Sequence, residues 1–313
     1  MSERNITLDF INPVAFFGVS NQNIDFLRNA FPKLKIVARD NILKLIGDEP
    51  EIATFENLIN LLIKHHSTTG IITPEAIQEY MDSDQKFAES QPELPADFIL
   101  HCHNGMIVKA RTPNQRRMVD SYAANDLIFA IGPAGTGKTY TAVALAVKAL
   151  KNKEVKRIIL TRPAVEAGEN LGFLPGDLKN KLDPYMQPLY DALWDMLPAQ
   201  KLTQYIEERI IEIAPLAFMR GRTLDNAVVI LDEAQNSTIS QMKMFLTRLG
   251  KSAKFIVTGD ITQIDLPKNQ ASGLIHTTKI LNNIQGIDFI YLTNKDIIRH
   301  KLVTKIINAY TAE

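Results

Sequence analysis

Residues 129–142, FAIGPAGTGKTYTA, constrain the fold of this 313-residue chain more than any other segment. An apolar run breaks into glycines, which a lysine, a threonine and a series of helix-forming residues follow. The octet GPAGTGKT matches G-x-x-x-x-G-K-[ST] in full. It lies between a predicted strand and a predicted helix, the context in which this pattern wraps a phosphate chain. The sequence therefore predicts a nucleotide held at a strand–loop–helix unit.

Each residue type in this loop has a physical reason. Three glycines let the backbone point its N–H groups at a phosphate, aided by the helix dipole. Lys138 is expected to place its charge at the β- and γ-phosphates, and Thr139 its hydroxyl at Mg²⁺. The predicted nucleotide-binding residues in and beside the loop are Gly132, Pro133, Ala134, Gly135, Thr136, Gly137, Lys138, Thr139 and Tyr140.

A second motif, VVILDEAQ, places two carboxylates after a buried strand, residues 228–231. Open α/β sheets bind ligands at the carboxyl ends of their strands. Asp232 is expected to hold Mg²⁺, directly or through water, and Glu233 to polarise the attacking water. The alternative is an acidic pair that caps a strand. Beside a phosphate loop, the adjacent glutamate favours hydrolysis over a nucleotide kinase.

The third motif, VTGDITQIDLP, follows the next apolar strand. Gln263 is expected to contact the γ-phosphate, and Asp260 to couple it to the neighbouring loop, with Thr258 as a further polar candidate. The alternative for Asp260 is a residue that caps the following turn. Upstream, the amide of Gln115 is suited to paired hydrogen bonds with adenine, or is an ordinary solvated side chain.

The chain divides into two regions of different texture. Residues 6–10, 34–39 and 42–47 read as strands and residues 21–31 and 49–66 as helices, with a hairpin turn at residues 40–41. This pattern predicts a small α+β unit over residues 1–82, KH-like in its strand–helix order but without a clear GxxG loop. Residues 83–104, polar and proline-bearing in their first part, are predicted to be a linker.

Residues 105–313 alternate apolar strands with helices. Predicted strands cover residues 126–132, 155–163, 226–235, 253–260 and 287–293, and a last helix covers residues 295–310. Such a pattern argues for an α/β fold, a mostly parallel sheet with helices on both faces. Residues 164–224 are long for a connection and suggest a functional insertion. Within it, Leu189, Leu193, Trp194 and Leu197 are expected to form the core face of a helix, and the loop ahead of them to meet nucleic acid.

The charge distribution and the cysteine content indicate which partners and which cellular compartment suit the protein. Residues 1–85 carry 7 Lys and Arg against 12 Asp and Glu, whereas residues 106–313 carry 27 against 20. A polyanion is therefore expected to meet the second region. No apolar run is long enough to cross a bilayer, and a single cysteine, Cys102, fits a reducing compartment. The predicted location is the cytoplasm.

These residues resemble a known family. GPAGTGKT, LDEAQN and GDITQIDLP look like motifs I, II and III of superfamily 1 helicases. The longer runs TRPAVEAGENLGFLPGDLKNKLDPYMQPLYDAL, PLAFMRGRTL and IIRHKLVTKIINAY are closer to PhoH-like proteins, over residues 105–313. The resemblance implies a P-loop NTPase with a RecA-like core that uses ATP and Mg²⁺, forms rings and takes part in RNA metabolism.

The resemblance also implies a missing part. A two-lobed helicase closes its ATP site with arginines from a second lobe, and this sequence has one set of strands. The cation is expected from elsewhere in the chain or from the next subunit of a homo-oligomer, with a hexameric ring favoured. The candidates are Arg299, Arg220 and Arg222, each of which is otherwise a surface salt-bridge residue. The alternatives to an RNA-coupled ATPase are an RNA helicase and a nucleotide-gated adaptor that recruits an endoribonuclease for ribosomal RNA maturation.

Overall fold

The computed structural model describes residues 2–8, 13–82, 97–102, 106–163 and 178–298. The chain forms two compact units. Unit 1 comprises Met1–Lys109 with Asp195–Lys201, and unit 2 comprises Ala110–Trp194 with Leu202–Glu313. No helix among the described residues is both long enough and apolar enough to span a membrane.

Unit 1 is a three-stranded antiparallel sheet packed against helices, which confirms the small α+β region. The sheet order is β1 (Ser2–Thr7), β3 (Ile42–Gly47), β2 (Lys35–Arg39). The helices are α1 (Pro13–Phe17), α2 (Gln22–Ala30), α3 (Glu49–Thr69) and α4 (Pro74–Asp82), with the 3-10 turn η1 (Val19–Asn21). Its core joins the inward residues of the sheet to those of α2 and α3, for example Leu43, Leu45, Ile24 and Phe55.

Most local signals of unit 1 match its elements, but the first strand, predicted over residues 6–10, lies earlier, at Ser2–Thr7. The register pairs Arg39 with Ile42, so the predicted two-residue hairpin turn is confirmed, with Asp40 at φ +52°. α3 ends at Gly70, a left-handed residue of the kind that stops helices. The turn between α1 and α2, residues 18–21, has glycine at its first position only and therefore lacks the second glycine of a GxxG loop. The KH-like interpretation stays a prediction. A second hairpin, β4 (Phe98–His101) with β5 (Ile107–Lys109), begins inside the segment predicted as a linker.

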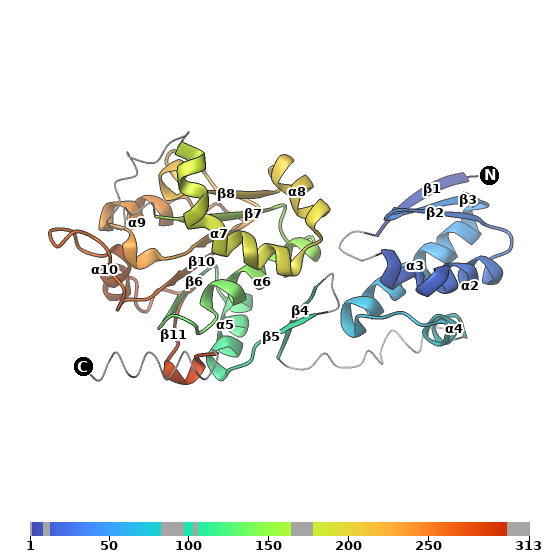
Figure 1. The fold of residues 1–313 in the computed structure, drawn as a ribbon, viewed down its shortest axis with the longest axis horizontal. Helices are drawn as coiled ribbons and strands as arrows, with labels where there is room; N and C mark the ends of the chain where they lie inside the picture. The colour runs from blue at the N-terminus through green and yellow to red at the C-terminus, as the bar shows by residue number, and fades with distance from the viewer. Residues whose placement is uncertain (1, 9–12, 83–96, 103–105, 164–177, 299–313) are drawn as a thin grey trace. The chain divides into compact units, whose positions relative to one another are not determined.

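Unit 2 contains a six-stranded sheet in the order β11-β6-β10-β9-β7-β8, with every neighbouring pair parallel (Figure 1). The strands are β6 (Leu127–Ile131), β7 (Arg157–Arg162), β8 (Ile211–Pro215), β9 (Ala227–Leu231), β10 (Lys254–Gly259) and β11 (Ile287–Tyr291). All residues of β6 and β9 are buried. The predicted α/β fold with a mostly parallel sheet is therefore confirmed.

Helices cover both faces of this sheet. On one face, α9 (Ile239–Leu246) and α10 (Gly273–Ile280) pack on a core that includes Phe129, Val229 and Phe255. On the other, α6 (Lys138–Lys151) contacts β7, β9 and β10, and α5 (Pro113–Ala124) contacts β6 and β11. The rings of Phe129 and Phe289 stack at 4.5 Å. Truncating such a buried ring to alanine costs about 3–5 kcal/mol, so this core fixes the strand positions firmly.

Three expectations need correction or restriction. The segment 164–224, predicted to be an insertion with one helix, also carries a strand of the sheet, β8, beside α7 (Leu178–Met196), α8 (Ala199–Glu207) and the 3-10 turn η4 (Leu216–Met219). Trp194 is 48% exposed, whereas Leu189, Leu193 and Leu197 are buried, so Trp194 lies at the edge of the core face. Of the helix predicted over residues 295–310, only residues 295–298 are described, and Lys295 and Asp296 there belong to a 3-10 turn, η6 (Asn294–Asp296); the rest lies outside the described residues.

Candidate functional site

The strand register brings the three sequence motifs to one edge of the sheet. Gly259 lies opposite Ile131, and Leu231 lies opposite both Val257 and Thr161. Gly132, Asp232 and Asp260 follow β6, β9 and β10, and Arg162 is the last residue of β7, so the four residues gather at the carboxyl ends of these strands. This is the place where open parallel sheets bind ligands.

The phosphate loop is a tight turn whose glycines serve different purposes. Gly135 and Gly137 have φ of +84° and +77°, a region that side chains other than glycine enter at a cost. Gly132 has no such angle, but a Cβ on it would lie 2.5 Å from the carbonyl oxygen of Leu292. The first glycine therefore lets the loop pass the end of β11, and the other two let the backbone turn.

The loop offers donors and a cation at its centre. The N–H groups of Gly135, Gly137 and Thr139 donate to no acceptor among the described residues, as in a loop that presents them to an anion. Lys138 is only 9% exposed, and its Nζ donates to the carbonyl oxygens of Gly132 (2.7 Å) and Pro133 (2.9 Å). α6 begins here, so its N-terminal dipole adds positive potential at the same point.

Asp232 is the most heavily bonded carboxylate of the site. It is 1% exposed. Its Oδ1 accepts from the hydroxyls of Thr139 (2.7 Å) and Thr258 (2.5 Å). Its Oδ2 accepts from Nε of Arg162 (2.8 Å), and the two side chains form an ion pair. The structure thus joins Thr139 and Asp232, the two residues predicted to serve Mg²⁺, and adds Arg162.

Glu233 is tied to the third motif through a side chain that the sequence motifs did not single out. The Nε2 of Gln235 donates to Glu233 Oε2 (2.6 Å), and the Oε1 of Gln235 accepts from the N–H of Asp260 (2.9 Å). Glu233 has φ +54°, a conformation that costs free energy and is common at functional sites. Gln235 therefore joins the second motif to the third, and coupling of a γ-phosphate through Asp260 stays a prediction.

The third motif forms a turn pinned to the second. Asp260 Oδ1 accepts from the N–H (2.9 Å) and hydroxyl (2.6 Å) of Thr262, so this oxygen caps the turn. Asn236 and Asp265 exchange two further hydrogen bonds between the same segments. The side chain of Gln263 is exposed at this turn. Its contact with a γ-phosphate stays a prediction.

Gln115 supports the phosphate loop from behind. It is 4% exposed, its Nε2 donates to the carbonyl of Thr136 (2.9 Å), and its Oε1 accepts from the N–H of Arg111 (2.8 Å). A Cβ on Gly137 would lie 2.8 Å from this Nε2. An adenine contact by Gln115 stays a prediction.

The chain after β11 also backs the loop. The N–H of Ile298 donates to the carbonyl of Gly135 (3.0 Å). Burial alone would raise the pKa of Asp296, but hydrogen bonds from Thr112, the Thr293 backbone and Asn114 outweigh it and lower that pKa. A carboxylate held in this way fixes the end of β11 against the start of α5.

The arginine candidates differ in what holds them. Arg222 makes two bonds to Glu212 (2.6 and 2.7 Å), which raise its pKa. Arg220 is exposed and forms no ion pair with another described residue. Arg299 lies outside the described residues, as does most of the loop predicted to meet nucleic acid.

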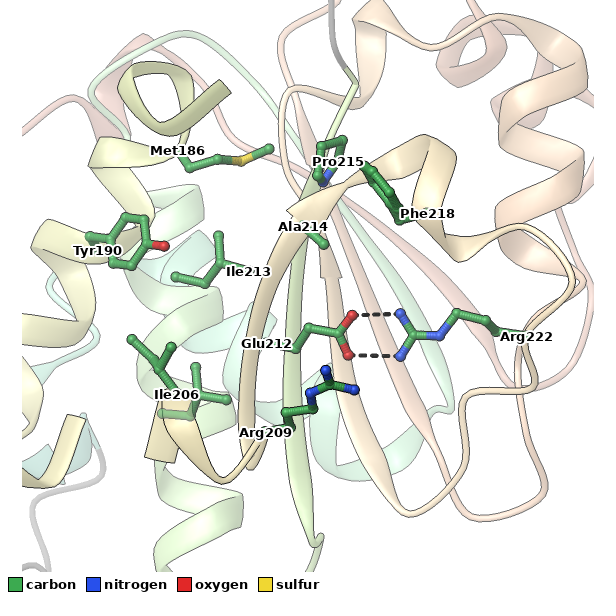
Figure 2. Close-up of a pocket in the computed structure, with 11 residues that line it drawn as sticks. Met186, Tyr190, Ile206, Arg209, Glu212, Ile213, Ala214, Pro215, Phe218 and Arg222 are labelled. Carbon is green, nitrogen blue, oxygen red and sulfur yellow. Dashed lines mark hydrogen bonds and ion pairs between the residues drawn. The ribbon is translucent and has the colours of Figure 1, made fainter. Parts of the chain in front are cut away.

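A separate cavity of about 650 Å³ lies along β8 (Figure 2). None of its lining residues belongs to the three motifs. Its walls come from α7, the end of α8, β8 and η4, and they include Met186, Tyr190, Ile213, Phe218 and the Glu212–Arg222 pair. This cavity is therefore distinct from the phosphate site. Helix α7 contributes to both, because Met186 and Tyr190 line the cavity and the carbonyl of Tyr185 accepts from Arg162.

The residues present suit a magnesium–nucleotide complex. Mg²⁺ prefers oxygen ligands, keeps several waters and takes one or two protein groups beside substrate phosphates. Thr139 and Asp232 supply a hydroxyl and a carboxylate 2.7 Å apart. Two buried oxygens at the ends of β7 and β10, the strands on either side of β9, have no hydrogen-bond partner among the described residues: Thr161 Oγ1 and Asp260 Oδ2. A bound metal with its waters would supply the missing charge and donors.

The fold and this site define a nucleotide-binding protein of the P-loop NTPase class. Comparison with known proteins narrows the class. The family model described as PhoH-like protein matches residues 107–311, and the chain belongs to this family.

Curated relatives agree with the family. A PhoH-like protein of Bacillus subtilis is 51% identical over 88% of this chain and 87% of its own length. One of Synechocystis is 44% identical over 99% and 95%. One of Mycobacterium tuberculosis is 46% identical over 95% and 84%. Since two of these alignments cover at least 95% of this chain, the likeness extends through unit 1.

Among solved structures, the Pif1 helicase from Candida albicans is similar to this chain at a TM-score of 0.35. The alignment has 15% identity over 63% of this chain and 42% of the helicase. A likeness at this level supports no argument about activity.

Proposed function

We propose that the protein is a Mg²⁺-dependent ATPase that acts on or beside RNA as a homo-oligomer in the cytoplasm. The observation that supports it best is the contact between Thr139 and Asp232, 2.7 Å, beside the buried Lys138. A hydroxyl, a carboxylate and a lysine in this arrangement suit phosphoryl transfer, in which positioning and charge stabilisation supply most of the catalysis.

In this proposal the side chains divide the work. Lys138 exchanges its two carbonyl acceptors for phosphate oxygens. Thr139 and Asp232 hold the metal, which supplies charge neutralisation at the phosphates when bound. Glu233 orients and deprotonates the attacking water, and Gln235 fixes its carboxylate against the Asp260 turn. Gln263 senses the γ-phosphate from the same turn.

A neighbouring subunit completes the site in this proposal. The described part of unit 2 holds one sheet, so the cation that closes the site comes from another copy. Arg220 is the best-placed described candidate, because it is exposed and forms no ion pair with another described residue, whereas Arg222 is engaged by Glu212. An arginine finger raises turnover by about 10³-fold or more.

The experiment measures phosphate release from ATP and from GTP, with MgCl₂ or EDTA and with or without single-stranded RNA, together with the mass in solution. We expect Mg²⁺-dependent ATP turnover that RNA increases, from an oligomer. A monomer without an RNA response would contradict the ring and the RNA link. Turnover that responds to an endoribonuclease and not to RNA would favour the adaptor, and ATP-driven strand displacement would favour a helicase.

A mixing experiment tests the shared site. Arg220→Ala and Lys138→Ala are each expected to be inactive alone. Mixed, a Lys138→Ala subunit supplies Arg220 to a neighbour whose phosphate loop is intact, so activity returns in part. Failure of the mixture to recover, with subunit exchange verified by mass, would exclude Arg220 as a finger in trans.

A further inference from the structure

Arg162 neutralises the carboxylate that the proposed function gives to the metal. Its guanidinium bonds Asp232 Oδ2, and the two side chains are 13% and 2% exposed. The other oxygen of Asp232 accepts from Thr139 and Thr258. The carboxylate is thus fully bonded by protein groups, in a place that water barely reaches.

The same guanidinium also holds a helix. Its Nη1 donates to the backbone carbonyl of Tyr185 in α7 (2.6 Å). Nearby residues of α7, Met186 and Tyr190, line the cavity along β8 (Figure 2). Arg162 therefore connects the phosphate site to a helix that forms one wall of a separate hollow.

A divalent cation and the guanidinium of Arg162 would repel each other if both bound the carboxylate of Asp232. Like charges repel strongly where solvent screening is weak. A cation next to Asp232 also removes the negative charge that makes burial of Arg162 tolerable. Thr139 has no such conflict, because its hydroxyl can donate to Asp232 while its oxygen lone pair faces a metal.

We propose that Arg162 and Mg²⁺ are alternative partners of Asp232, and that the exchange between them passes the occupancy of the phosphate site to α7. This inference rests on the proposed Mg²⁺ site. When metal binds, the guanidinium of Arg162 leaves Asp232 Oδ2. Its bond to the Tyr185 carbonyl then either breaks or shifts α7, so the helix responds in both cases. Arg162 is a positioning residue in this scheme, because it acts on the site through Asp232.

The first test compares Arg162→Gln with Arg157→Gln, a control at the opposite end of β7 that bonds the carbonyl of Asp225. Thermal unfolding is followed in EDTA and in MgCl₂ alone. We expect Arg162→Gln to unfold at a lower temperature than the wild type in EDTA and to gain more from Mg²⁺. The control should respond to Mg²⁺ as the wild type does. An equal Mg²⁺ response in all three proteins would overturn the exchange.

The second test titrates MgCl₂ against fluorescent ADP. With its competitor removed, Arg162→Gln should need about ten-fold less Mg²⁺ for half-saturation, a normal size for coupling between linked sites. Arg162→Lys keeps a charge but loses the planar fork, so it should fall between the two; it also serves if the glutamine variant does not fold. An unchanged Mg²⁺ requirement in both variants would contradict the proposal.

The third test reads α7 directly. The chain has one tryptophan, Trp194, which lies on α7 and is 48% exposed. ADP with Mg²⁺ should shift its emission in the wild type, and ADP with EDTA should not. Arg162→Gln should show the shifted emission before any addition. Emission that ignores Mg²⁺ and the substitution would remove α7 from the scheme.

Failure of the proposed function would look different. If no variant bound ADP with Mg²⁺, the ATPase assignment would fall. The thermal comparison in MgCl₂ alone would still decide whether Arg162 and the metal compete, because it needs no nucleotide.

Discussion

The two units bury different kinds of polar group. In unit 1, the buried polar side chains among the described residues are Asn23, His66 and His101, which lie on separate elements. Asn23 donates to the carbonyls of Phe16 and Ile72, a purely structural use. In unit 2, the buried set includes one lysine and three carboxylates near the carboxyl ends of the strands: Lys138, Asp232, Asp260 and Asp296.

This difference separates a scaffold from a site. Burying a charge costs free energy unless partners compensate it, so a fold without a chemical task has little use for several together. Unit 2 places these residues near the carboxyl ends of its strands, around a loop that can hold an anion, and each of them is hydrogen-bonded by neighbouring groups. Changes in this group should therefore alter chemistry, and changes in unit 1 should alter stability alone.

The largest expected effect comes from Lys138→Ala. Loss of the cation that neutralises the phosphates should lower ATP turnover by about 10³-fold. The measurement is steady-state phosphate release, and Lys148→Ala, on the same helix and away from the loop, serves as the control. Normal turnover by Lys138→Ala would break the assignment of the site to unit 2.

Glu233→Gln should come next. It keeps the shape of the side chain but cannot accept a proton, so turnover should fall by about 100-fold while nucleotide binding stays intact. Single-turnover hydrolysis and binding of fluorescent ATP separate the two. If binding were lost as well, Glu233 would be a structural or metal-binding residue.

A smaller effect is expected from Gln235→Leu, which removes both bonds that join Glu233 to the Asp260 turn. Turnover should fall by about ten-fold, as for other residues that orient a catalytic group. Gln241→Leu, which breaks the capping box of α9, serves as a stability control. It should lower the stability by about 1 kcal/mol and leave the turnover of the folded protein unchanged. Equal turnover in the two variants would show that Gln235 only stabilises the fold.

The smallest effect concerns unit 1 and pH. Burial lowers the pKa of His65 below its ordinary value of 6.5, and its ring lies at 5.5 Å from that of Tyr80. The unfolded chain therefore takes up the proton first as the pH falls. The contribution of neutral His65 to the free energy of unfolding is therefore present above pH 6.5. It is lost as the pH falls from 6.5 toward the lower pKa that His65 has in the folded protein.

Hydrogen exchange of α3, corrected for the intrinsic effect of pH, measures this loss. Protection should fall by about three-fold between pH 7.5 and 5.5, and ATP turnover at pH 7.5 should be unaffected by His65→Gln. His65→Gln should remove the pH dependence. If it changed turnover instead, the two units would not be separable as scaffold and site.

The sequence predicted the centre of the fold well. Continuous apolar runs such as Leu127–Ile131 and Ala227–Leu231 are typical of strands buried on both faces, and both are strands of the parallel sheet. β8 was missed because IEIAP is short and only its first residue is buried. Trp194 was misplaced because it lies one position from Leu193, at the border of the buried stripe.

The site was predictable where its chemistry is local. The loop and Asp232 follow from spacing and from their place after strands. The pairing of Arg162 with Asp232 joins residues 70 apart, and no local pattern predicts it. A usable signal was nonetheless present, since the threonine and arginine of the TRP sequence end β7, the strand that lies beside β9. Gln235 could likewise have been recognised as the polar residue following Asp232, Glu233 and Ala234.

The contact of Gly132 with β11 has a consequence for what a signature motif records. Any side chain there would collide with the Leu292 carbonyl, whether or not a nucleotide ever binds. A library of variants selected for folding alone, with catalysis irrelevant, should therefore still keep glycine at position 132. The first glycine of the motif thus reflects the packing of the loop against the end of β11, whereas Lys138 and Thr139 reflect the binding of a ligand.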